Sequence, residues 1–498
     1  MLRKTRILLA TICFTLITLL FLDFSGVIHA WFGWMAKLQF LPALLSSGSI
    51  TVLAIIIVTM LFGRIYCSVI CPLGVYQDGV SHIAEKRKKN RYTFKKSHKW
   101  LRYAITMVFV TLLFAGLNAI AILIAPYSIY GRIASNLFAP VYELINNGLA
   151  YLAERWHSYA FYHVDVYVKS LPIFILSIAY FLIITILSLT SGRWYCNTVC
   201  PVGTILGFFA KYSIFKPVFD ADKCSGCGLC EKNCRCSAID SQNHVIDYTK
   251  CVSCFNCISQ CHLEALRYKL AGNVIHAGKD KIADKDAEGK TSRKTFIATI
   301  ATIAAASTTS AQEKIVDGGL ATIVKKKAPK REIPLKPAGS LSLDNFTSRC
   351  TGCQLCVQVC PNDVLRASNR LETFMQPEMS FERGYCRPEC VRCSEACPAD
   401  AIQKVTCEQK TSIQIGHAVW IGRNCVPLRD GVECGNCARH CPAGAISMMP
   451  YDTEDSSSHK IPIINEERCI GCGACEHVCP ARPFSAIYVE GNINHRNI

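Results

Sequence analysis

The sequence predicts a membrane-embedded bundle of α-helices joined to two smaller α+β domains that are rich in cysteine. Three observations lead to this fold class: long apolar runs in roughly the first 200 positions, a motif repeated after two of these runs, and cysteines at short regular spacings. The chain has 498 residues and 31 cysteines, so two to four domains are expected. Disulfide scaffolds are short secreted chains, so the cysteines of this long chain favour metal ligation.

Four membrane spans are expected, at about 7–25, 48–65, 101–125 and 171–190. Each is long enough, or nearly so, to cross a hydrocarbon core of about 30 Å. The first run follows three basic residues and has no small-residue cleavage site soon after it. We therefore expect an uncleaved helix that starts in the cytoplasm and not a signal peptide. The aromatic segment from Trp31 to Leu45 suits the outer membrane interface.

The distribution of basic residues predicts the orientation of this bundle. The stretch from Glu85 to Arg102 holds nine lysines or arginines, whereas the loop from Pro126 to Ser170 holds three. Because basic loops remain in the cytoplasm, 66–100 is expected inside and 126–170 outside.

A motif is repeated at the cytoplasmic ends of the second and fourth expected spans. One copy runs from Gly63 to Gly74 and the other from Gly192 to Gly203, and both read Gly-Arg-x-Tyr-Cys-x3-Cys-Pro-x-Gly. Each proline ends the preceding helix, and each glycine permits a turn. If the two hairpins pack side by side, four thiols could form an extra redox or metal site, on Cys67, Cys71, Cys196 and Cys200. The alternative is four buried cysteines that cap helices.

No histidine lies within the four expected spans, so a b-type haem buried in the bundle would have no bis-histidine ligands. The chain also has no Cys-x2-Cys-His motif for c-type haem. The membrane part is therefore expected to handle electrons through a quinone, iron–sulfur or thiol chemistry. Candidates for a quinol site are the outer loop and the two cytoplasmic turns, with His157, His163, Asp165, Tyr66 and Tyr195. The sequence identifies no catalytic residue.

Two runs of four cysteines follow the fourth span, each spaced Cys-x2-Cys-x2-Cys-x3-Cys as in a two-cluster bacterial ferredoxin. In that arrangement three close thiolates hold one [4Fe-4S] cluster and the fourth reaches the other cluster. The predicted sets are Cys224, Cys227, Cys230 and Cys261, and Cys251, Cys254, Cys257 and Cys234. A zinc ribbon also uses Cys-x2-Cys pairs, but two pairs would suffice for it.

Four further cysteine runs follow between 341 and 498. The first and fourth have ferredoxin spacing, whereas the second and third are stretched, so a loop must lie between ligands. Sixteen cysteines suffice for four clusters, although spacing alone does not say which run completes which cluster. These cysteines are Cys350, Cys353, Cys356, Cys360, Cys386, Cys390, Cys393, Cys397, Cys425, Cys434, Cys437, Cys441, Cys469, Cys472, Cys475 and Cys479.

Three cysteines remain, and none is expected to be a ligand: Cys13, Cys236 and Cys407. One of them leaves an alternative open. Arg235-Cys236 follows Cys234 where a ferredoxin usually has proline, so either cysteine of this pair could be the ligand.

The expected domains are a four-helix membrane domain over 1–212, a two-cluster ferredoxin over 213–275, a linker over 276–340 and a four-cluster ferredoxin over 341–498. Within the linker, Arg293-Lys294 and the apolar run 295–311 are similar to a twin-arginine export signal with lysine as the second basic residue. We expect a fifth crossing here that carries the last domain outside; the alternative is a short linker helix. Basic residues at 325–336 argue against export only weakly, because large domains cross largely regardless of charge.

The predicted fold class is thus a membrane α-helical bundle, of four spans plus a fifth anchor helix, with two α+β ferredoxin-like iron–sulfur domains. In the paired Cys-x3-Cys-Pro motifs and the ferredoxin, 1–270 resembles the NapH-type membrane quinol dehydrogenase of periplasmic nitrate reductase systems. In the export signal and four cluster motifs, 291–490 resembles its NapG-type partner, a pair also similar to the MauN/MauM-like proteins. The departures are Arg293-Lys294 and the stretched second run of the last domain.

This resemblance implies a fusion of the two proteins in the bacterial inner membrane, acting in anaerobic respiration. It implies six [4Fe-4S] clusters, with quinol as the electron donor. Whether the paired motifs hold a seventh cluster stays open. The first ferredoxin would be cytoplasmic and the last domain periplasmic, passing electrons to a periplasmic reductase or cytochrome. The chain would be a quinol dehydrogenase component without a substrate reductase site of its own.

Six clusters serve electron transport more naturally than substrate chemistry, and no Gly-x-Gly-x-x-Gly fingerprint suggests direct oxidation of NADH. The formal charge of +17 does not indicate nucleic-acid binding, because each oxidised cluster with four thiolates carries about −2 and no aromatic–basic RNA motif is present. The alternative functions are maturation of a metal centre and redox sensing.

Overall fold

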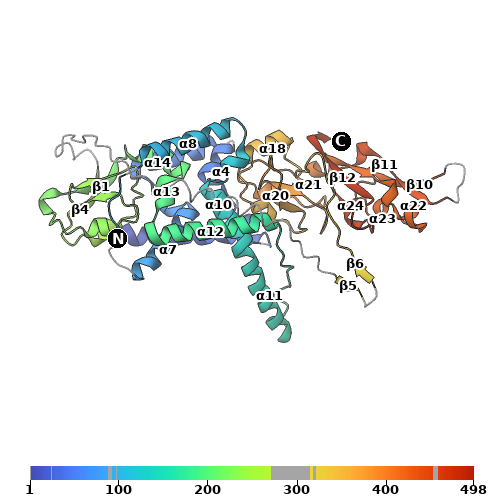
Figure 1. Ribbon diagram of the computed structural model, residues 1–498, viewed down its shortest axis with the longest axis horizontal. Coiled ribbons are helices and arrows are strands. Elements are labelled where there is room, and N and C mark those ends of the chain that lie inside the picture. Colours follow the sequence, from blue (N-terminus) through green and yellow to red (C-terminus); the bar gives the residue numbers. More distant parts are fainter. Residues whose placement is uncertain are drawn as a thin grey trace, which may run out of the picture.

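The protein is an elongated molecule in which a helical bundle separates two cysteine-rich domains (Figure 1). The structure, a computed structural model, describes residues 2–23, 25–46, 48–87, 92–96, 98–270, 315–317, 321–452 and 458–498. The N-terminus lies beside the first cysteine-rich domain, and the C-terminus lies in the last domain at the other end of the molecule.

The bundle contains long helices that run along the molecule and short helices that connect them. The longer ones are α1 (Leu2–Leu22), α5 (Ser49–Phe62), α7 (Pro72–Arg87), α8 (Lys99–Phe114), α11 (Ala139–Arg155), α12 (Leu171–Ser191) and α14 (Pro201–Ala210). The short ones are α2 (Val27–Phe32), α3 (Trp34–Lys37), α4 (Phe40–Leu45), α6 (Ile65–Val69), α9 (Asn118–Ala121), α10 (Pro126–Ile133) and α13 (Trp194–Thr198). A single π-helical segment, η1 (Ala134–Phe138), joins α10 to α11.

Two of the four expected spans are present as full-length helices. Within the described residues, α1 and α12, each of 21 residues, are the two helices long and apolar enough to cross a membrane. The expectation of full-length helices at 48–65 and 101–125 was wrong, because α5 has 14 residues and α8 has 16. Gly116 ends α8, the helix at the third expected span, before it reaches full length. Its φ of 73° places it in the left-handed region that is typical of helix ends. The expected anchor helix at 295–311 lies outside the described residues.

The first cysteine-rich domain is a small α+β unit. Its outer strands, β1 (Phe215–Phe219) and β4 (Leu266–Leu270), pair antiparallel and bring the two ends of the domain together. Between them lie α15 (Leu229–Lys232), β2 (Ile239–Asp240), β3 (Val245–Ile246) and α16 (Asn256–Gln260). Each short helix carries the third cysteine of its run, Cys230 on α15 and Cys257 on α16.

The last domain is also α+β and is built from antiparallel strand pairs. The pairs are β7 (Leu365–Ala367) with β8 (Pro377–Met379), β9 (Ile413–Trp420) with β12 (Ile487–Asn497), and β10 (Ile446–Pro450) with β11 (Lys460–Ile464). Its helices are α18 (Leu343–Arg349), α19 (Leu355–Gln358), α20 (Arg392–Ala396), α21 (Cys407–Thr411), α22 (Val426–Asp430), α23 (Asn436–Arg439) and α24 (Ala474–Val478). A separate hairpin, β5 (Ile315–Asp317) and β6 (Ala321–Ile323), precedes the domain.

Helix α12 runs from one cysteine-rich domain to the other. Just before it, the Lys169 ammonium donates a hydrogen bond to the carbonyl of Val357 in the last domain, at 3.2 Å. Just after it, the Arg193 N–H donates to the carbonyl of Arg235 in the first domain, at 3.0 Å. The helix is about 30 Å long at 1.5 Å per residue, so the two domains are separated by about the thickness of a hydrocarbon core.

Helix α1 makes the same connection in the opposite direction. Near its start, the Arg3 guanidinium donates to the Ser259 hydroxyl of the first cysteine-rich domain, at 3.2 Å. Just beyond its end, Gly26 packs against the Arg392 guanidinium of the last domain. Both α1 and α12 therefore have the first cysteine-rich domain at one end and the last domain at the other.

Candidate iron–sulfur and thiol sites

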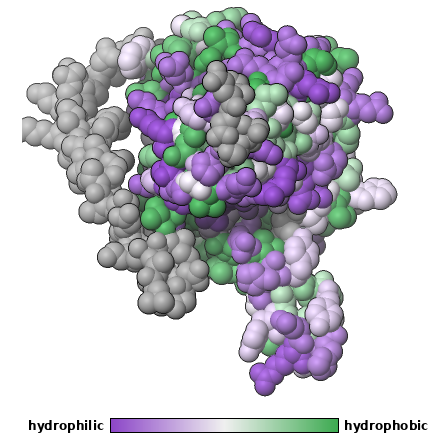
Figure 2. Space-filling model, turned by 90° about the vertical axis from the view of Figure 1, so that its right-hand side faces the viewer, coloured by the Kyte–Doolittle hydropathy of each residue, from purple (hydrophilic) through white to green (hydrophobic). Residues whose placement is uncertain are grey.

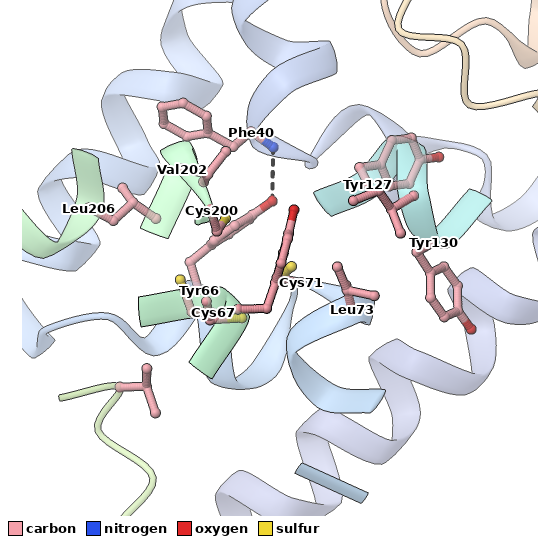
Figure 3. Close-up of a cluster of buried hydrophobic side chains, with 14 of the residues drawn as sticks. Phe40, Tyr66, Cys67, Cys71, Leu73, Tyr127, Tyr130, Cys200, Val202 and Leu206 are labelled. Atoms are coloured by element: carbon pink, nitrogen blue, oxygen red, sulfur yellow. Dashed lines mark hydrogen bonds between the residues drawn. The ribbon is translucent and has the colours of Figure 1, made fainter. Parts of the chain in front are cut away.

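The four cysteines of the repeated motif come together in the bundle core. Cys67 lies on α6, Cys71 precedes α7, Cys196 lies on α13 and Cys200 precedes α14, and each is at most 5% exposed. Burial raises the pKa of the Cys200 thiol, and so do the neighbouring thiols of Cys196, Cys71 and Cys67. Figure 3 shows three of these sulfurs grouped around the ring of Tyr66. The hairpins therefore pack side by side, which is the condition under which the four thiols could share one site.

Each half of the repeat uses its arginine to reach the other half. The Arg193 guanidinium donates a hydrogen bond to the Cys67 carbonyl at 2.8 Å, and the Arg64 guanidinium donates to the Cys196 carbonyl at 3.3 Å. A Cβ on Gly74 would lie 2.3 Å from the Cys67 carbonyl oxygen, and a Cβ on Gly203 equally close to that of Cys196. Only glycine fits these two positions, which explains why the motif ends in glycine.

A buried carboxylate holds three arginines together beside the thiols. Asp78 on α7 accepts a hydrogen bond from Arg193 Nε at 2.7 Å, pairs with Arg6 of α1, and lies 3.8 Å from Arg235 of the first cysteine-rich domain. Burial alone would raise the pKa of Asp78, but Arg193 and Arg6 hold it well below its usual range. These contacts join α1, α7, the second motif and the first cysteine-rich domain into one unit.

The first cysteine-rich domain gathers its eight cysteines into two sets. One cavity, of about 190 Å³, is lined by Cys224, Cys227, Cys230 and Cys261. A second cavity is lined by Cys234, Cys251, Cys254 and Cys257. These are the two sets expected from the interleaved ferredoxin pairing.

One cysteine that was not expected to be a ligand lies in the second cavity. Cys236 is 6% exposed and lines this cavity together with Cys234. It also lies close enough to Arg193 for the guanidinium to lower the pKa of its thiol, against a larger rise due to burial. The signal in the sequence was the Arg235-Cys236 pair in place of the usual proline.

The two other leftover cysteines differ in their surroundings. Cys13 of α1 packs against the bundle core, and the Cys407 thiol is exposed and donates to the Glu389 carbonyl at 3.1 Å. That neither cysteine is a ligand stays a prediction.

The last domain brings cysteines from different runs near one another. Burial raises the pKa of the Cys350, Cys353 and Cys356 thiols of the first run, and Cys397 from the second run lies close enough to raise it further. Conversely, Cys360 of the first run lines a cavity with Cys386, Cys390 and Cys393. The third and fourth runs exchange their last cysteines in the same way, giving Cys425, Cys434, Cys437 and Cys479, and Cys469, Cys472, Cys475 and Cys441.

Sets of four thiols around a cavity are compatible with iron–sulfur clusters. In the described part of the chain, no group of three or more His, Cys, Asp or Glu side chains is close enough to hold one metal ion. Zinc would need its thiolates about 2.3 Å from a single point. A [4Fe-4S] cluster takes four thiolates on four separate irons, so sets of four thiols around a cavity fit it.

The candidate quinol residues lie in different surroundings. Tyr66 is buried, where its hydroxyl accepts from the Phe40 N–H at 2.9 Å and donates to Gln39 at 3.2 Å. The Tyr195 hydroxyl donates to the Ile124 carbonyl at 2.7 Å. His157, His163 and Asp165 lie exposed after α11. Both tyrosine hydroxyls therefore serve internal hydrogen bonds, and the quinol site stays a prediction.

Comparison with known proteins defines the class of the protein. Residues 45–91 and 173–219, which contain the two repeated motifs, each match the family described as 4Fe-4S binding domain. Residues 349–401 and 432–482 each match the family described as 4Fe-4S dicluster domain. The protein is therefore an iron–sulfur, ferredoxin-type electron-transfer protein with four such matching segments.

Three individual relatives indicate the family more closely. The methylamine utilization ferredoxin-type protein MauM of Methylobacillus flagellatus is 30% identical over 166 residues, which are 32% of this chain and 70% of the relative. The ferredoxin-type protein NapG of Escherichia coli is 28% identical over 159 residues, 30% of this chain and 66% of that protein. An uncharacterized protein of Methanocaldococcus jannaschii is 28% identical over 222 residues, 44% of this chain and 70% of its own length. The chain belongs to the family of MauM-type ferredoxins.

Proposed function

We propose that the protein carries electrons from quinol in a membrane to an acceptor protein outside the cytoplasm. Six [4Fe-4S] clusters would be held by the six sets of cysteines in the two ferredoxin domains. A seventh would be held by Cys67, Cys71, Cys196 and Cys200 between them. When bound, these clusters supply one-electron transfer, and the chain supplies the thiolates, the burial and the charges that set each potential.

The observation that carries this proposal is the placement of the two ferredoxin domains at opposite ends of α1 and α12. A membrane around these two helices would put one domain on each side. The basic segment between α7 and α8 is attached to the end that carries the first ferredoxin, because the Tyr92 N–H donates to the Lys232 carbonyl at 3.2 Å. The positive-inside rule then favours a cytoplasmic first ferredoxin and an external last domain.

Apolar side chains on the outside of the bundle support a lipid environment. On the span-length helices, Leu8 is 61% exposed and Ile183 is 54% exposed. The shorter helices present similar faces, with Ile50 of α5 83% exposed and Met107 of α8 66% exposed. A water-soluble protein rarely exposes so much contiguous apolar surface, so we infer that α5 and α8 also lie in the membrane, where the irregular segments beside them are covered by protein.

The far end of the molecule has a different surface. Figure 2 shows that the face formed by the last domain is mostly hydrophilic, with apolar residues scattered over it. A surface of this kind suits an aqueous compartment and a docking partner that is itself soluble.

The buried groups around the central thiols have positioning roles in this proposal. Arg64 lies 3.8 Å from the Cys67 sulfur and brings a positive charge next to the thiolates. Gln77 donates to the Cys196 sulfur at 3.4 Å, and the Gly203 N–H donates to the Cys200 sulfur at 3.3 Å. Hydrogen bonds and positive charge at sulfur favour the reduced state of a cluster.

Reduction by quinol in membranes tests the proposal. Proteoliposomes of the anaerobically purified protein would receive a reduced menaquinol analogue, and cluster signals would be followed by electron spin resonance. We expect reduction of the clusters, about 28 irons per chain for seven clusters of four, and protection of the first ferredoxin but not the last domain from external protease in spheroplasts. Zinc in place of iron, or no reduction by quinol, would contradict the proposal.

A further inference from the structure

An open cleft of about 820 Å³ lies where the end of α1 meets the last domain. One wall is formed by α2 and α3, with His29, Trp31 and Trp34. The other wall includes Val359 and Arg392 of the last domain. The volume falls within the range of small-molecule sites, which is about 300–1,000 Å³.

The wall on the side of the last domain is built from residues next to cluster cysteines. Val359 directly precedes Cys360, and Arg392 directly precedes Cys393. Glu395, which also lines the cleft, is two residues before Cys397. A molecule in the cleft would therefore lie against two cysteine sets at once, because Cys397 and Cys360 belong to different sets.

His29 is the titratable group on the opposite wall. Its Nδ1 atom is buried and has no hydrogen-bond partner within the described residues. Burial lowers the pKa of His29, whereas Asp23, Glu395 and a hydrogen bond to the backbone of Ala396 act in the opposite direction. The backbone of this turn is fixed because the Asp23 carboxylate accepts from the backbone N–H of His29 at 2.9 Å and from the backbone N–H of Gly26 at 2.7 Å.

The cleft is reached from the position expected for the membrane surface. It begins just after Leu22, the last residue of α1. Trp31 is 75% exposed and Trp34 is 57% exposed. Exposed tryptophans immediately after a span are typical of the membrane–water interface, so a lipid-soluble ligand could enter the cleft with its tail still in the bilayer.

We propose that this cleft is the site where the hydroquinone headgroup of quinol is oxidised, and that His29 is its proton acceptor. This inference rests on the proposed function and adds the site to it. The hydroquinone loses two electrons and two protons and leaves as quinone. The Cys350–Cys397 and Cys360–Cys393 sets would each hold a [4Fe-4S] cluster, and each cluster, when bound, would take one of the two electrons. One hydroxyl proton goes to the imidazole of His29, and the other goes to water in the open cleft.

The first test locates the ligand on the unmodified protein. The full chain in lipid nanodiscs would be photolabelled with an azidoquinone, and the labelled peptides would be sequenced. We expect label on the segments 25–37 and 392–404, which line the two walls. Label on 157–165, or on the turns that carry Tyr66 and Tyr195, would overturn the assignment.

The second test compares two histidines. His29→Gln should weaken binding of a fluorescent hydroxyquinoline N-oxide, a hydroquinone analogue, by about ten-fold through loss of one hydrogen bond to the ring. It should slow reduction of the clusters by menaquinol about a hundred-fold through loss of the proton acceptor. The matched control is His157→Gln, since His157 is exposed in the outer loop and should behave like the wild type.

Two readouts separate the possible failures. Reduction by dithionite bypasses the cleft, so equal cluster signals in both variants and the wild type would show that His29→Gln is folded and loaded. A wild type that quinol reduces, with a His29→Gln variant that binds and reacts equally well, would overturn the site alone. A wild type that neither binds the analogue nor accepts electrons from quinol would overturn the proposed function with it.

Discussion

The two halves of the internal repeat place one arginine each beside the same four thiols, but their electrostatic partners differ. Arg193 is paired with the Asp78 carboxylate at 2.7 Å. Arg64 has no carboxylate partner within the described residues and instead donates to the Asn197 side chain and the Thr249 carbonyl, both at 3.0 Å. The repeat is therefore symmetric in its backbone and asymmetric in its charge.

The reason for this asymmetry lies in the space on the helix after each motif. Asp78 lies six residues after Pro72, and the equivalent residue after Pro201 is Gly207. A Cβ on Gly207 would lie 2.6 Å from the Thr249 carbonyl oxygen, so a carboxylate does not fit there. The Asp78 carboxylate of the first half thus neutralises Arg193. The second half has no equivalent carboxylate, so the charge of Arg64 remains directed at the thiols. One arginine serves mainly assembly and the other mainly the electrostatics of the thiol site.

The largest effect is expected on removal of the shared carboxylate. Asp78→Ala leaves Arg6, Arg193 and Arg235 buried without their common counter-ion. Breaking a buried ion pair of this kind costs about 3–5 kcal/mol of unfolding free energy, which thermal unfolding in detergent would detect. Asp430→Ala is the control, because Asp430 forms an exposed pair with Arg429 and its loss should leave the melting temperature unchanged. Equal melting temperatures for both variants would show that Asp78 does not hold the bundle together.

Substitution of equivalent cysteines in the two halves tests whether the four thiols form one site. Cys71→Ser and Cys200→Ser remove equivalent thiols from the two halves. Each should remove one cluster, which is about four irons per chain, while the six ferredoxin clusters remain. Iron quantitation and the electron spin resonance spectrum would measure this loss. If either variant kept its full iron content, the four cysteines would be helix-capping residues, which was the alternative from the sequence.

The sequence predicts the parts of this site that depend on local spacing. The range expected for the fourth span, 171–190, agrees with α12, and the two cysteine sets of the first ferredoxin lie where the interleaved spacing places them. The repeat itself was enough to suggest that its four thiols meet.

Features that depend on contacts between distant segments could not be read from the sequence. Asp78 receives its arginines from three separate segments, and the pairing of Cys397 with the first run of the last domain depends on how stretched loops fold. The early end of α8 depends on the conformation of a single glycine, Gly116. The sequence does not single out His29, because nothing in its neighbours along the chain indicates that α20 lies beside it.

The arginines themselves are expected to have different effects when replaced. Arg193→Met should lower the unfolding free energy by about 2–3 kcal/mol, since Asp78 loses one of its three arginine partners but keeps Arg6 and Arg235. Arg64→Met leaves no carboxylate without its partner, so it should lower the unfolding free energy less than Arg193→Met does. It should instead lower the reduction potential of the central cluster by on the order of 100 mV, because a positive charge near sulfur is lost. Redox titration followed by electron spin resonance would measure the shift, and equal shifts for both variants would contradict the division of roles.

The tyrosines of the two motifs should give the smallest difference. The Tyr66 hydroxyl makes two buried hydrogen bonds, to the Phe40 N–H and to Gln39, whereas the Tyr195 hydroxyl makes one, to the Ile124 carbonyl. Tyr66→Phe should therefore cost about 2 kcal/mol of unfolding free energy and Tyr195→Phe about 1 kcal/mol, because each leaves its buried partners unsatisfied. Thermal unfolding of the two variants side by side measures this order. A larger loss for Tyr195→Phe would mean that the second half of the repeat, and not the half that carries Asp78, is the more tightly held.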